Sequence, residues 1–333
     1  MTILFEGKPI KTPDASTFWR VIQEYNVKVF FTAPTAFRAI KKEDPNGQLK
    51  SLYDTSCLKY VFLAGERTDL ATLEWCEKML NVPVIDHWWQ TESGFPMLSN
   101  MTGIEFAKIK PGSVGQAVCG FDIQILDTDG QPLPSNTEGV VGIKYPLPPG
   151  CLPNLWQDTA RFKSSYLSQF PGYYFSGDGG YKDEDGYVYI TGRIDDIINV
   201  AGHRLSTAEM EEVVASHPAI AECAVVGIAD DLKGQIPVGF FILKAGVEST
   251  EAEIEKELIL KVRQTIGPVA AFKRAVSVER LPKTRSGKIL RKIIRAIADN
   301  RPFNPPSTIE DMTVLDELKL LMNEKNIGKV GML

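Results

Sequence analysis

The first hundred residues alternate signals for strands and helices, and this alternation limits the folds that the chain can adopt. Short apolar runs predict three strands, at 27–31, 58–63 and 82–85. A polar–apolar pattern over 69–80 predicts a helix between the last two strands. Strands joined through helices at this spacing form a parallel sheet that is covered by helices. Ligands bind such sheets at the carboxyl ends of the strands, where segments 64–66 and 86–92 fall.

The rest of the chain has a different pattern. From about residue 111, short strands and acidic turns predict a β-rich subdomain. After Asp195 a smaller α+β unit begins, in which Ser206 and Glu209 form a capping-box pattern and later helices carry apolar stripes. The sequence therefore predicts an α/β fold in three parts: a large domain over 1–195, a small domain over 196–303 and a helical tail over 304–333.

The composition excludes several classes of protein. The 333 residues are 44% hydrophobic and 24% charged with a net charge of −5, which is typical of a soluble globular protein and not of a nucleic-acid binder. No apolar run approaches the roughly 18 residues of a transmembrane helix, and no signal peptide is visible at the start. Five cysteines without a C-x-x-C pair indicate reduced, intracellular thiols, and the three histidines form no zinc motif.

The densest group of cations is the loop 282–288, in which a glycine directly precedes Lys288. It is not a Walker A loop, because the earlier glycine and the hydroxyl after the lysine are missing. A lysine at the tip of a tight loop can serve as a mobile charge for a phosphate or a carboxylate. The alternative is a solvated basic loop beside a surface helix.

Asp178 lies among glycines, which leave its carboxylate open to close approach by a partner such as a ribose hydroxyl. The alternative for Asp178 is a turn or capping residue. Arg193, Asp195 and Arg204 lie near one another in the sequence, and alone they would be surface ion pairs of little energetic value.

These patterns also occur together, in a fixed order. Residues 173–178 (YYFSGD), 190–196 (ITGRIDD), 199–204 (NVAGHR) and the Lys288 loop follow segment 86–92 (DHWWQTE). In this combination the chain resembles the adenylate-forming acyl-CoA synthetase superfamily, and most closely its short-chain branch, the acetyl- and propionyl-CoA synthetases. The resemblance extends over nearly the whole chain. It implies part of the large adenylate-forming domain, with a parallel sheet and a β-rich subdomain, followed by the small α+β domain.

The resemblance also implies a two-step ligase reaction. A short-chain carboxylate attacks the α-phosphate of ATP to give an acyl-adenylate and pyrophosphate, and the thiol of CoA then displaces AMP. The implied partners are the small molecules ATP, CoA and the carboxylate, with Mg²⁺ as cofactor and with no nucleic acid or membrane. The resemblance is compatible with a homo-oligomer, and the compartment that it implies is the mitochondrial matrix or the cytoplasm.

The resemblance assigns roles to individual positions. Lys288 would be the catalytic residue, stabilising charge between the carboxylate and the α-phosphate. The nucleotide would be bound by Gly65, Glu66, Arg67, Asp86, His87, Trp88, Trp89, Gln90, Thr91, Asp178, Arg193 and Arg204. The remaining implied roles are the acyl pocket for Ala64 and Trp89, CoA binding for Ala201, Gly202 and Arg263, a hinge for Asp195, and metal association for Glu92, Ala215, His217 and Ile220.

The sequence departs from the pattern of this superfamily in several ways. Arg67 stands where a proline is usual in acetyl-CoA synthetases, His87 replaces a threonine, and Ala201 replaces a frequent serine. No stretch resembles the phosphate loop rich in Gly, Ser and Thr. The chain is therefore expected to be the C-terminal part of such an enzyme and to lack activity alone.

Two residues narrow the range of acids that are expected as substrates. Acetate-specific members resemble this region but have a valine at the position of Ala64. The smaller alanine is expected to leave room in the pocket for one more methylene, and the pocket is therefore expected to prefer propionate over acetate. Trp89 argues against long-chain acids. Two alternatives stay open: a relative that acts on another acid, and a non-catalytic module that binds nucleotide or CoA or pairs with a full-length subunit.

Overall fold

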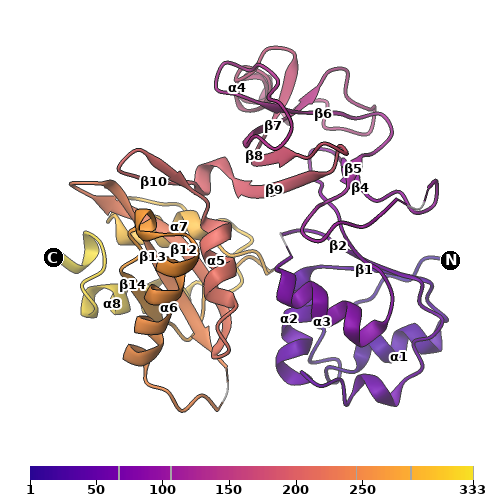
Figure 1. Ribbon diagram of the computed structural model, residues 1–333, viewed down its shortest axis with the longest axis horizontal. Helices are drawn as coiled ribbons and strands as arrows, with labels where there is room; N and C mark the ends of the chain where they lie inside the picture. Colours follow the sequence, from indigo (N-terminus) through magenta and orange to yellow (C-terminus); the bar gives the residue numbers. More distant parts are fainter. Residues whose placement is uncertain (67, 106, 245, 286, 333) are drawn as a thin grey trace. The chain divides into compact units, whose positions relative to one another are not determined.

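The computed structural model describes residues 1–332 except 67, 106, 245 and 286. The chain divides into two compact units, Met1–Ile190 and Thr191–Leu333, each with its own sheets and core (Figure 1). The prediction of a mixed α/β fold with a parallel sheet and a β-rich subdomain is confirmed.

The first unit begins with a three-stranded parallel sheet. Its order is β1-β2-β3, made by Val29–Thr32, Tyr60–Leu63 and Val84–Asp86. Three helices accompany it, α1 (Thr17–Glu24), α2 (Pro34–Glu43) and α3 (Leu70–Leu80). The strands and α3 confirm the sequence prediction, and Asp69 caps α3 by accepting from the backbone N–H of Thr72 at 2.8 Å.

The two faces of this sheet differ. One face packs against α1, α2 and α3 in a core whose members include Trp19, Phe37, Val61, Leu63 and Val84. On β1, Val29 and Phe31 are 52% and 56% exposed. Parallel sheets are normally covered on both faces. Apolar side chains are therefore exposed on this strand of the sheet.

The middle of the chain forms the β-rich part of the first unit. A short antiparallel pair joins β4 (Leu98–Ser99) to β5 (Gln116–Ala117). A four-stranded sheet of order β6-β7-β8-β9 follows, made by Asp122–Leu126, Gly139–Lys144, Tyr173–Lys182 and Val188–Arg193. Helix α4 (Thr159–Tyr166) lies in the connection between β7 and β8.

A bulge interrupts the pairing of β7 with β8. Gly142 pairs with Phe175 and Val140 with Gly179, so three residues of β8 lie opposite the single residue Val141. Within the bulge, Ser176 donates its hydroxyl to the carbonyl of Val141 at 2.6 Å and accepts the backbone N–H of Asp178 at 3.0 Å. Bulges re-aim side chains, and this bulge contains Asp178.

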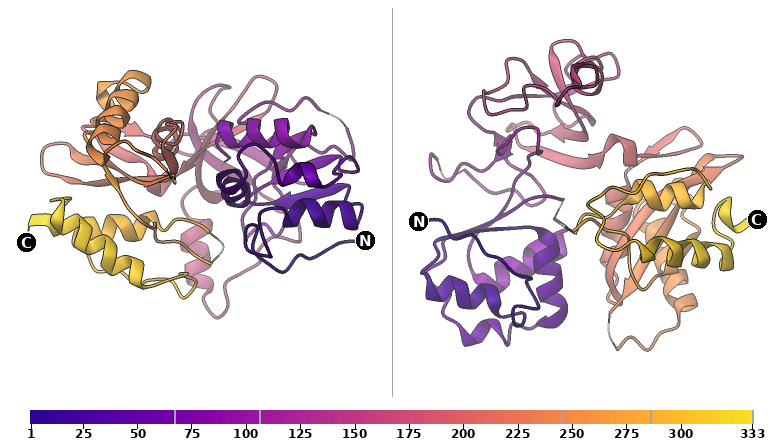
Figure 2. Two further views of the ribbon diagram at one scale, coloured as in Figure 1. Left: turned by 90° about the horizontal axis from the view of Figure 1, so that it is seen from below. Right: turned by 180° about the vertical axis from the view of Figure 1, so that it is seen from behind.

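The second unit is a mixed sheet between two helical layers (Figure 2). Strand β13 pairs with β12, β10 and β14, and β11 extends the sheet beyond β10. The strands are β10 (Ile198–Val200), β11 (His203–Leu205), β12 (Ile220–Asp230), β13 (Gly234–Leu243) and β14 (Arg274–Ser277). The helices of this unit are α5 (Thr207–Ala215), α6 (Glu251–Thr265), α7 (Arg291–Ala298) and α8 (Thr313–Glu324). Short 3-10 turns lie at Lys50–Leu52 in the first unit and at Ile194–Asp196, Pro268–Ala270 and Val330–Met332 in the second.

Neighbouring residues of β13 supply two different cores. Phe241 belongs to the core with α5 and α6, which includes Met210, Ile254 and Leu258. Phe240 belongs to the core with α7 and α8, which includes Ile294, Leu318 and Met322. Side chains alternate between the faces of a strand, so β13 joins both layers.

We expect segment 191–333 to fold alone and both layers to contribute to its stability. Phe240→Ala and Phe241→Ala should each lower the free energy of unfolding by about 3–5 kcal/mol, because both rings are fully buried. Urea denaturation measures the effect, with Leu260→Ala on the exposed side of α6 as a control that changes it by less than about 0.5 kcal/mol. A phenylalanine variant as stable as the control would show that its layer contributes little.

Candidate functional site

The carboxyl ends of β2 and β3 lie side by side, because Leu63 pairs with Asp86. Gly65 follows β2 with a φ of +103°, and no atom lies within 4 Å of the position that a Cβ would occupy. Glu66 pairs with Arg38 of α2 at 2.8 Å, and Asp86, which is buried, accepts the backbone N–H of Thr68 at 3.3 Å. Arg67 lies outside the described residues.

Asp178 is a buried carboxylate held by side chains that follow β3. Its Oδ2 accepts the indole N–H of Trp88 at 3.1 Å and the amide Nε2–H of Gln90 at 2.8 Å. Hydrogen bonds to an ionised carboxylate are stronger than those between neutral groups. The structure thus brings together three residues that the sequence predicted as nucleotide ligands.

Two tyrosines support this group and were not predicted from the sequence. Tyr174 donates its hydroxyl to Oε1 of Gln90 at 2.9 Å, while Nε2 of Gln90 also donates to the carbonyl of Ser176 at 2.8 Å. Tyr166 stacks on Tyr174 with ring centroids 5.5 Å apart and donates to Oε1 of Glu92 at 2.9 Å. The bulge between Tyr174 and Asp178 interrupts the alternation of side chains, so the spacing of these residues in the sequence did not indicate Tyr174.

His87 packs against two aromatic rings of neighbouring strands. Its centroid is 5.3 Å from that of Phe31 and 5.7 Å from that of Phe62, and the side chain is 7% exposed. No hydrogen-bond partner is present for Nδ1 among the described residues. Burial lowers the pKa of His87 to about 4, so the ring is neutral at pH 7.

Three further predicted residues lie near these strand ends. Ala64 directly follows β2, and its side chain is buried. Trp89 and Thr91 are exposed in the segment after β3. Their predicted roles toward the acyl group and the nucleotide stay predictions.

The second unit carries its predicted residues on separate elements. Ala201 and Gly202 form the turn between β10 and β11, both with positive φ, as a two-residue hairpin of this kind requires. Arg204 is exposed on β11, Arg193 ends β9, and Arg263 lies in the last turn of α6. Asp195 pairs with Lys292 of α7 at 2.6 Å, and the hydrogen bond from Lys292 lowers the pKa of this carboxyl.

The loop of Lys288 is closed by two hydrogen bonds between Thr284 and Lys288. Thr284 donates its N–H to the carbonyl of Lys288 at 2.9 Å and accepts the N–H of Lys288 on its hydroxyl at 3.1 Å. Gly287 has a φ of +87° and completes the turn. The Lys288 side chain is exposed, so a defined loop presents a cation to solvent.

His217 lies just after α5, between Ala215 and the first residue of β12, Ile220. Its Nδ1 accepts the backbone N–H of Ala219 at 3.2 Å, and its Nε2 lies 2.7 Å from Oε2 of Glu257. Both ring nitrogens are therefore used within the protein. The metal association of this segment stays a prediction.

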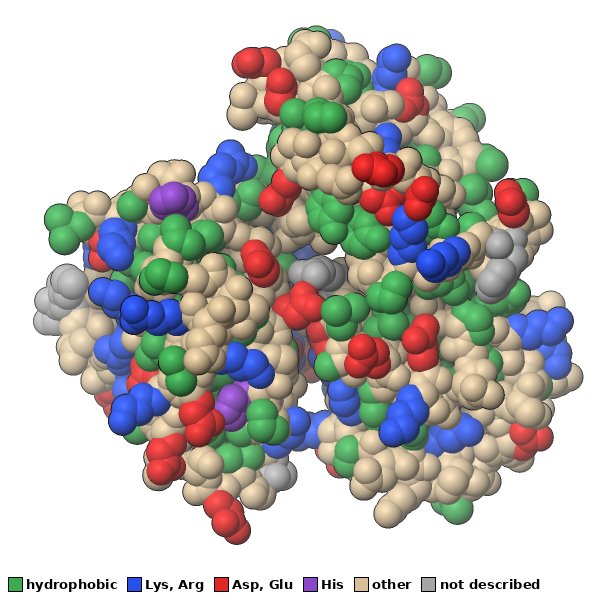
Figure 3. All heavy atoms as spheres, viewed as in Figure 1, with side chains coloured by type: hydrophobic (Ala, Val, Ile, Leu, Met, Phe, Trp, Pro, Cys, Tyr) green, Lys and Arg blue, Asp and Glu red, His purple; other side chains and the backbone are tan. Residues whose placement is uncertain are grey.

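The described residues contain no group of three or more His, Cys, Asp or Glu side chains arranged to hold a metal ion by themselves. Within the same residues, no helix has the length and apolar character needed to cross a membrane. On the face shown in Figure 3, Lys and Arg side chains are interspersed with Asp and Glu.

Comparison with known proteins gives consistent matches. The family model for AMP-binding enzymes matches residues 1–147, and that for the AMP-binding enzyme C-terminal domain matches residues 209–288. An uncharacterized protein of Pseudomonas aeruginosa is 51% identical over 98% of this chain and 52% of its own length. The mitochondrial acyl-CoA synthetase short-chain family member 3 of Homo sapiens is 46% identical over 97% of this chain and 47% of its own length.

A solved structure shows the same fold. The anthranilate CoA ligase AuaEII in complex with anthranoyl-AMP has a TM-score of 0.74 at 28% identity, covering 88% of this chain and 53% of that one. The chain thus spans about half the length of the relatives that it matches.

His87 should make the first unit sensitive to acid. The unfolded imidazole takes up its proton near pH 6.5 and the folded one only near 4, so protonation favours unfolding as the pH falls between these values. Between pH 6.5 and pH 4, the free energy of unfolding of the wild type should fall by up to about 3 kcal/mol more than that of His87→Gln. The measurement is urea unfolding followed by tryptophan fluorescence, because all five tryptophans lie within residues 1–190.

The control is His203→Gln, which changes an exposed histidine of the other unit. It should leave the pH profile of tryptophan fluorescence unchanged. Parallel profiles for wild type and His87→Gln would contradict the buried, neutral state of His87.

Proposed function

The chain belongs to the AMP-binding enzyme family, and on this premise we propose that it is the C-terminal catalytic part of an ATP-dependent short-chain acyl-CoA synthetase. Such an enzyme joins a carboxylate to CoA through an acyl-adenylate, with release of pyrophosphate and then AMP. Short-chain acyl-CoA synthetases among the relatives support this activity.

The observation that carries the proposal is the bonding of Asp178 to Trp88 and Gln90. It joins segment 86–92 to segment 173–178, and both segments are proposed to bind the nucleotide. A preorganised carboxylate of this kind suits the paired hydroxyls of a ribose, and Arg193 is proposed to assist it. Gly65, with open space beside its Cα, together with Glu66 and Arg67, is proposed to line the adenine.

Charge stabilisation is assigned to the second unit. Arg204 is proposed to face phosphate oxygens, and Lys288 to neutralise the charge that develops between the attacking carboxylate and the α-phosphate. Exposure of both side chains and the closed geometry of the Lys288 loop support these roles.

The chemistry of Glu92 fits Mg²⁺. This cation usually takes one or two carboxylates and completes its coordination with substrate phosphates and water, so a site without a protein cage is suitable. The hydroxyl of Tyr166 orients Glu92 through Oε1. When bound, Mg²⁺ would neutralise phosphate charge, and Ala215, His217 and Ile220 are proposed as a second magnesium-associated segment.

The second half-reaction is assigned to other residues. Ala201, Gly202 and Arg263 are proposed to contact CoA, and Asp195 is proposed as the hinge about which the small domain rotates between half-reactions. Ala64 and Trp89 are proposed to line a pocket that prefers propionate over acetate. This substrate would place the enzyme in short-chain fatty acid metabolism. Its location is proposed to be the mitochondrial matrix or the cytoplasm, in line with relatives from mitochondria and from a bacterium.

The chain is proposed to need a further polypeptide to complete its catalytic site. The relatives are about twice as long, and the exposed Val29 and Phe31 mark a face of the parallel sheet that such a polypeptide would cover. The alternative is a non-catalytic module that pairs with a full-length subunit, which the same apolar surface would also suit.

The deciding experiment joins the chain to the preceding half of its human relative. The joined protein should form propionyl-CoA with release of AMP and pyrophosphate, whereas the 333-residue chain alone should release no pyrophosphate. In the joined protein, Lys288→Ala should reduce acyl-adenylate formation by at least about 10²-fold, because a transition-state charge is lost. Thioester formation from supplied acyl-adenylate should be spared.

Arg285→Ala is the matched control, since it removes another exposed cation from the same loop. Equal loss of both half-reactions in Lys288→Ala would contradict the assigned role. A joined protein that folds but forms no acyl-CoA would favour the non-catalytic module.

Ala64 should set the preference for chain length. Ala64→Val fills the space of about one methylene, which is worth roughly 1–3 kcal/mol of discrimination in an apolar pocket. The ratio of kcat/KM for propionate over acetate should therefore fall by about 10-fold or more. An unchanged ratio would show that another residue determines the preference.

A further inference from the structure

The segment 191–196 connects the two units and is bonded to elements of the second unit. It comprises the end of β9 and the 3-10 turn Ile194–Asp196. The compact second unit begins at Thr191, so the boundary between the two units divides β9 and residues 191–196 are the first residues of the second unit. Two of its side-chain contacts join the ends of the segment to helices of the second unit.

The first contact is made by Ser206. Its Oγ donates to the carbonyl of Thr191 at 2.8 Å and accepts the backbone N–H of Glu209 at 3.3 Å. The same hydroxyl therefore caps α5 and binds the connecting segment. Gly192 passes close to the first turn of α5, since a Cβ at this position would lie 3.7 Å from that of Ala208.

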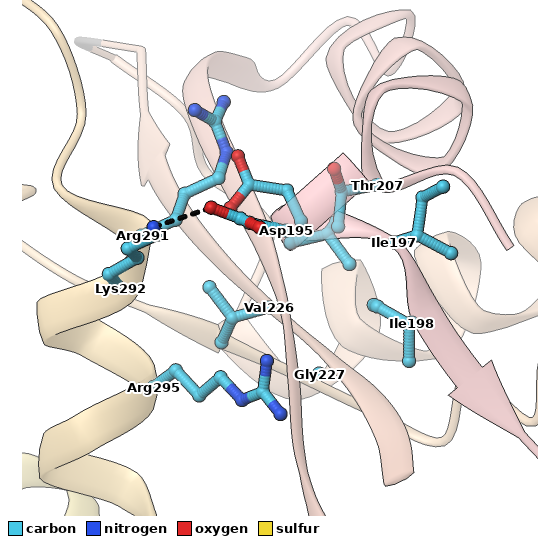
Figure 4. Close-up of a pocket in the computed structure, with 11 residues that line it drawn as sticks. Asp195, Ile197, Ile198, Thr207, Val226, Gly227, Arg291, Lys292 and Arg295 are labelled. Carbon is cyan, nitrogen blue, oxygen red and sulfur yellow. Dashed lines mark hydrogen bonds and ion pairs between the residues drawn. The ribbon is translucent and has the colours of Figure 1, made fainter. Parts of the chain in front are cut away.

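The second contact is the ion pair between Asp195 and Lys292, which is drawn in Figure 4. Lys292 lies at the start of α7, and the atoms are 2.6 Å apart. The side chains of Lys292 and Asp195 are 73% and 49% exposed, so the pair changes an equilibrium constant by only about fivefold or less. A contact of this strength can open and close readily.

We propose that Ser206 and Lys292 are positioning residues that hold segment 191–196 on the second unit. Their contacts with Thr191 and Asp195 are called the two clasps here, and the opening of these clasps controls the rotation of this unit between the two half-reactions. This inference rests on the proposed function. Rotation about Asp195 changes the backbone angles between the two contacts. Residues 191–194 must then leave α5, which breaks the bond from Ser206 to Thr191.

Each clasp can be opened without unfolding its helix. Ser206→Asp keeps the cap of α5, because aspartate is as good an N-cap as serine, but it cannot donate to the carbonyl of Thr191. Ser206→Thr keeps both functions. Lys292→Met removes the charge and retains the length of the stem, whereas Lys292→Arg keeps the charge.

The first test needs no enzymatic activity and uses the full 333-residue chain. Arg193 provides a trypsin site inside the clasped segment. Cleavage after Arg193 should be about two- to tenfold faster in Ser206→Asp and in Lys292→Met than in wild type. Ser206→Thr and Lys292→Arg should restore the wild-type rate, and cleavage after Lys261 in α6 should be the same in all variants. Wild-type cleavage at Arg193 in both Ser206→Asp and Lys292→Met would overturn the clasp.

The second test measures the two half-reactions separately in the joined protein described above. Ser206→Asp and Lys292→Met should both change the ratio of adenylation to thioester formation in the same direction, by about two- to tenfold. Lys256→Met, which alters an exposed lysine of α6, should leave the ratio unchanged. An unchanged ratio in the clasp variants overturns their role in rotation. Absence of both half-reactions in the wild-type joined protein overturns the proposed function and the kinetic role with it, whereas the trypsin result still decides whether the clasp exists.

Discussion

The two hydrogen bonds that Asp178 receives from Trp88 and Gln90 determine how the first unit presents its polar groups. Their partners are 90 and 88 residues apart in the sequence, and they connect the end of a parallel strand to a bulged antiparallel strand. A buried carboxylate that loses its donors costs about 1–3 kcal/mol or more. The positions of Tyr174 and Ser176 follow from this connection, because both are hydrogen-bonded to Gln90. The position of Glu92 follows as well, because it is hydrogen-bonded to Tyr166, which stacks on Tyr174.

Sequence reasoning predicted those elements whose burial leaves a periodic pattern. The strands of the parallel sheet and α3 belong to this group. Helix α2 was not predicted, although Pro34 at its first position is a residue that suits the first turn of a helix. Helix α4 was missed because none of its residues is buried, so it carries no apolar stripe to detect.

The same distinction applies to the candidate site. Trp88, Gln90 and Asp178 lie in compact motifs, so the sequence alone marked them as candidate nucleotide ligands. Tyr166 and Arg38 contribute through bonds to Glu92 and Glu66 that span 74 and 28 residues. Such partners are chosen by tertiary packing, and no local pattern marks them. The dual use of the Ser206 hydroxyl is hidden for the same reason, since the sequence indicates only its capping role.

The alternation of Phe240 and Phe241 in β13 has a consequence for how the second unit finds its fold. In a sheet with one polar face, slipping a strand by one residue exposes apolar side chains to water, and this penalty fixes the pairing. Both faces of β13 are apolar, so a slip against β12 would only exchange one core residue for another. The alignment of β12 with β13 must therefore come from their connection, where Asp230 accepts the backbone N–H groups of Leu232 and Lys233 and Gly234 adopts a φ of +76°. The three-residue connection 231–233 thus decides which phenylalanine each helical layer receives.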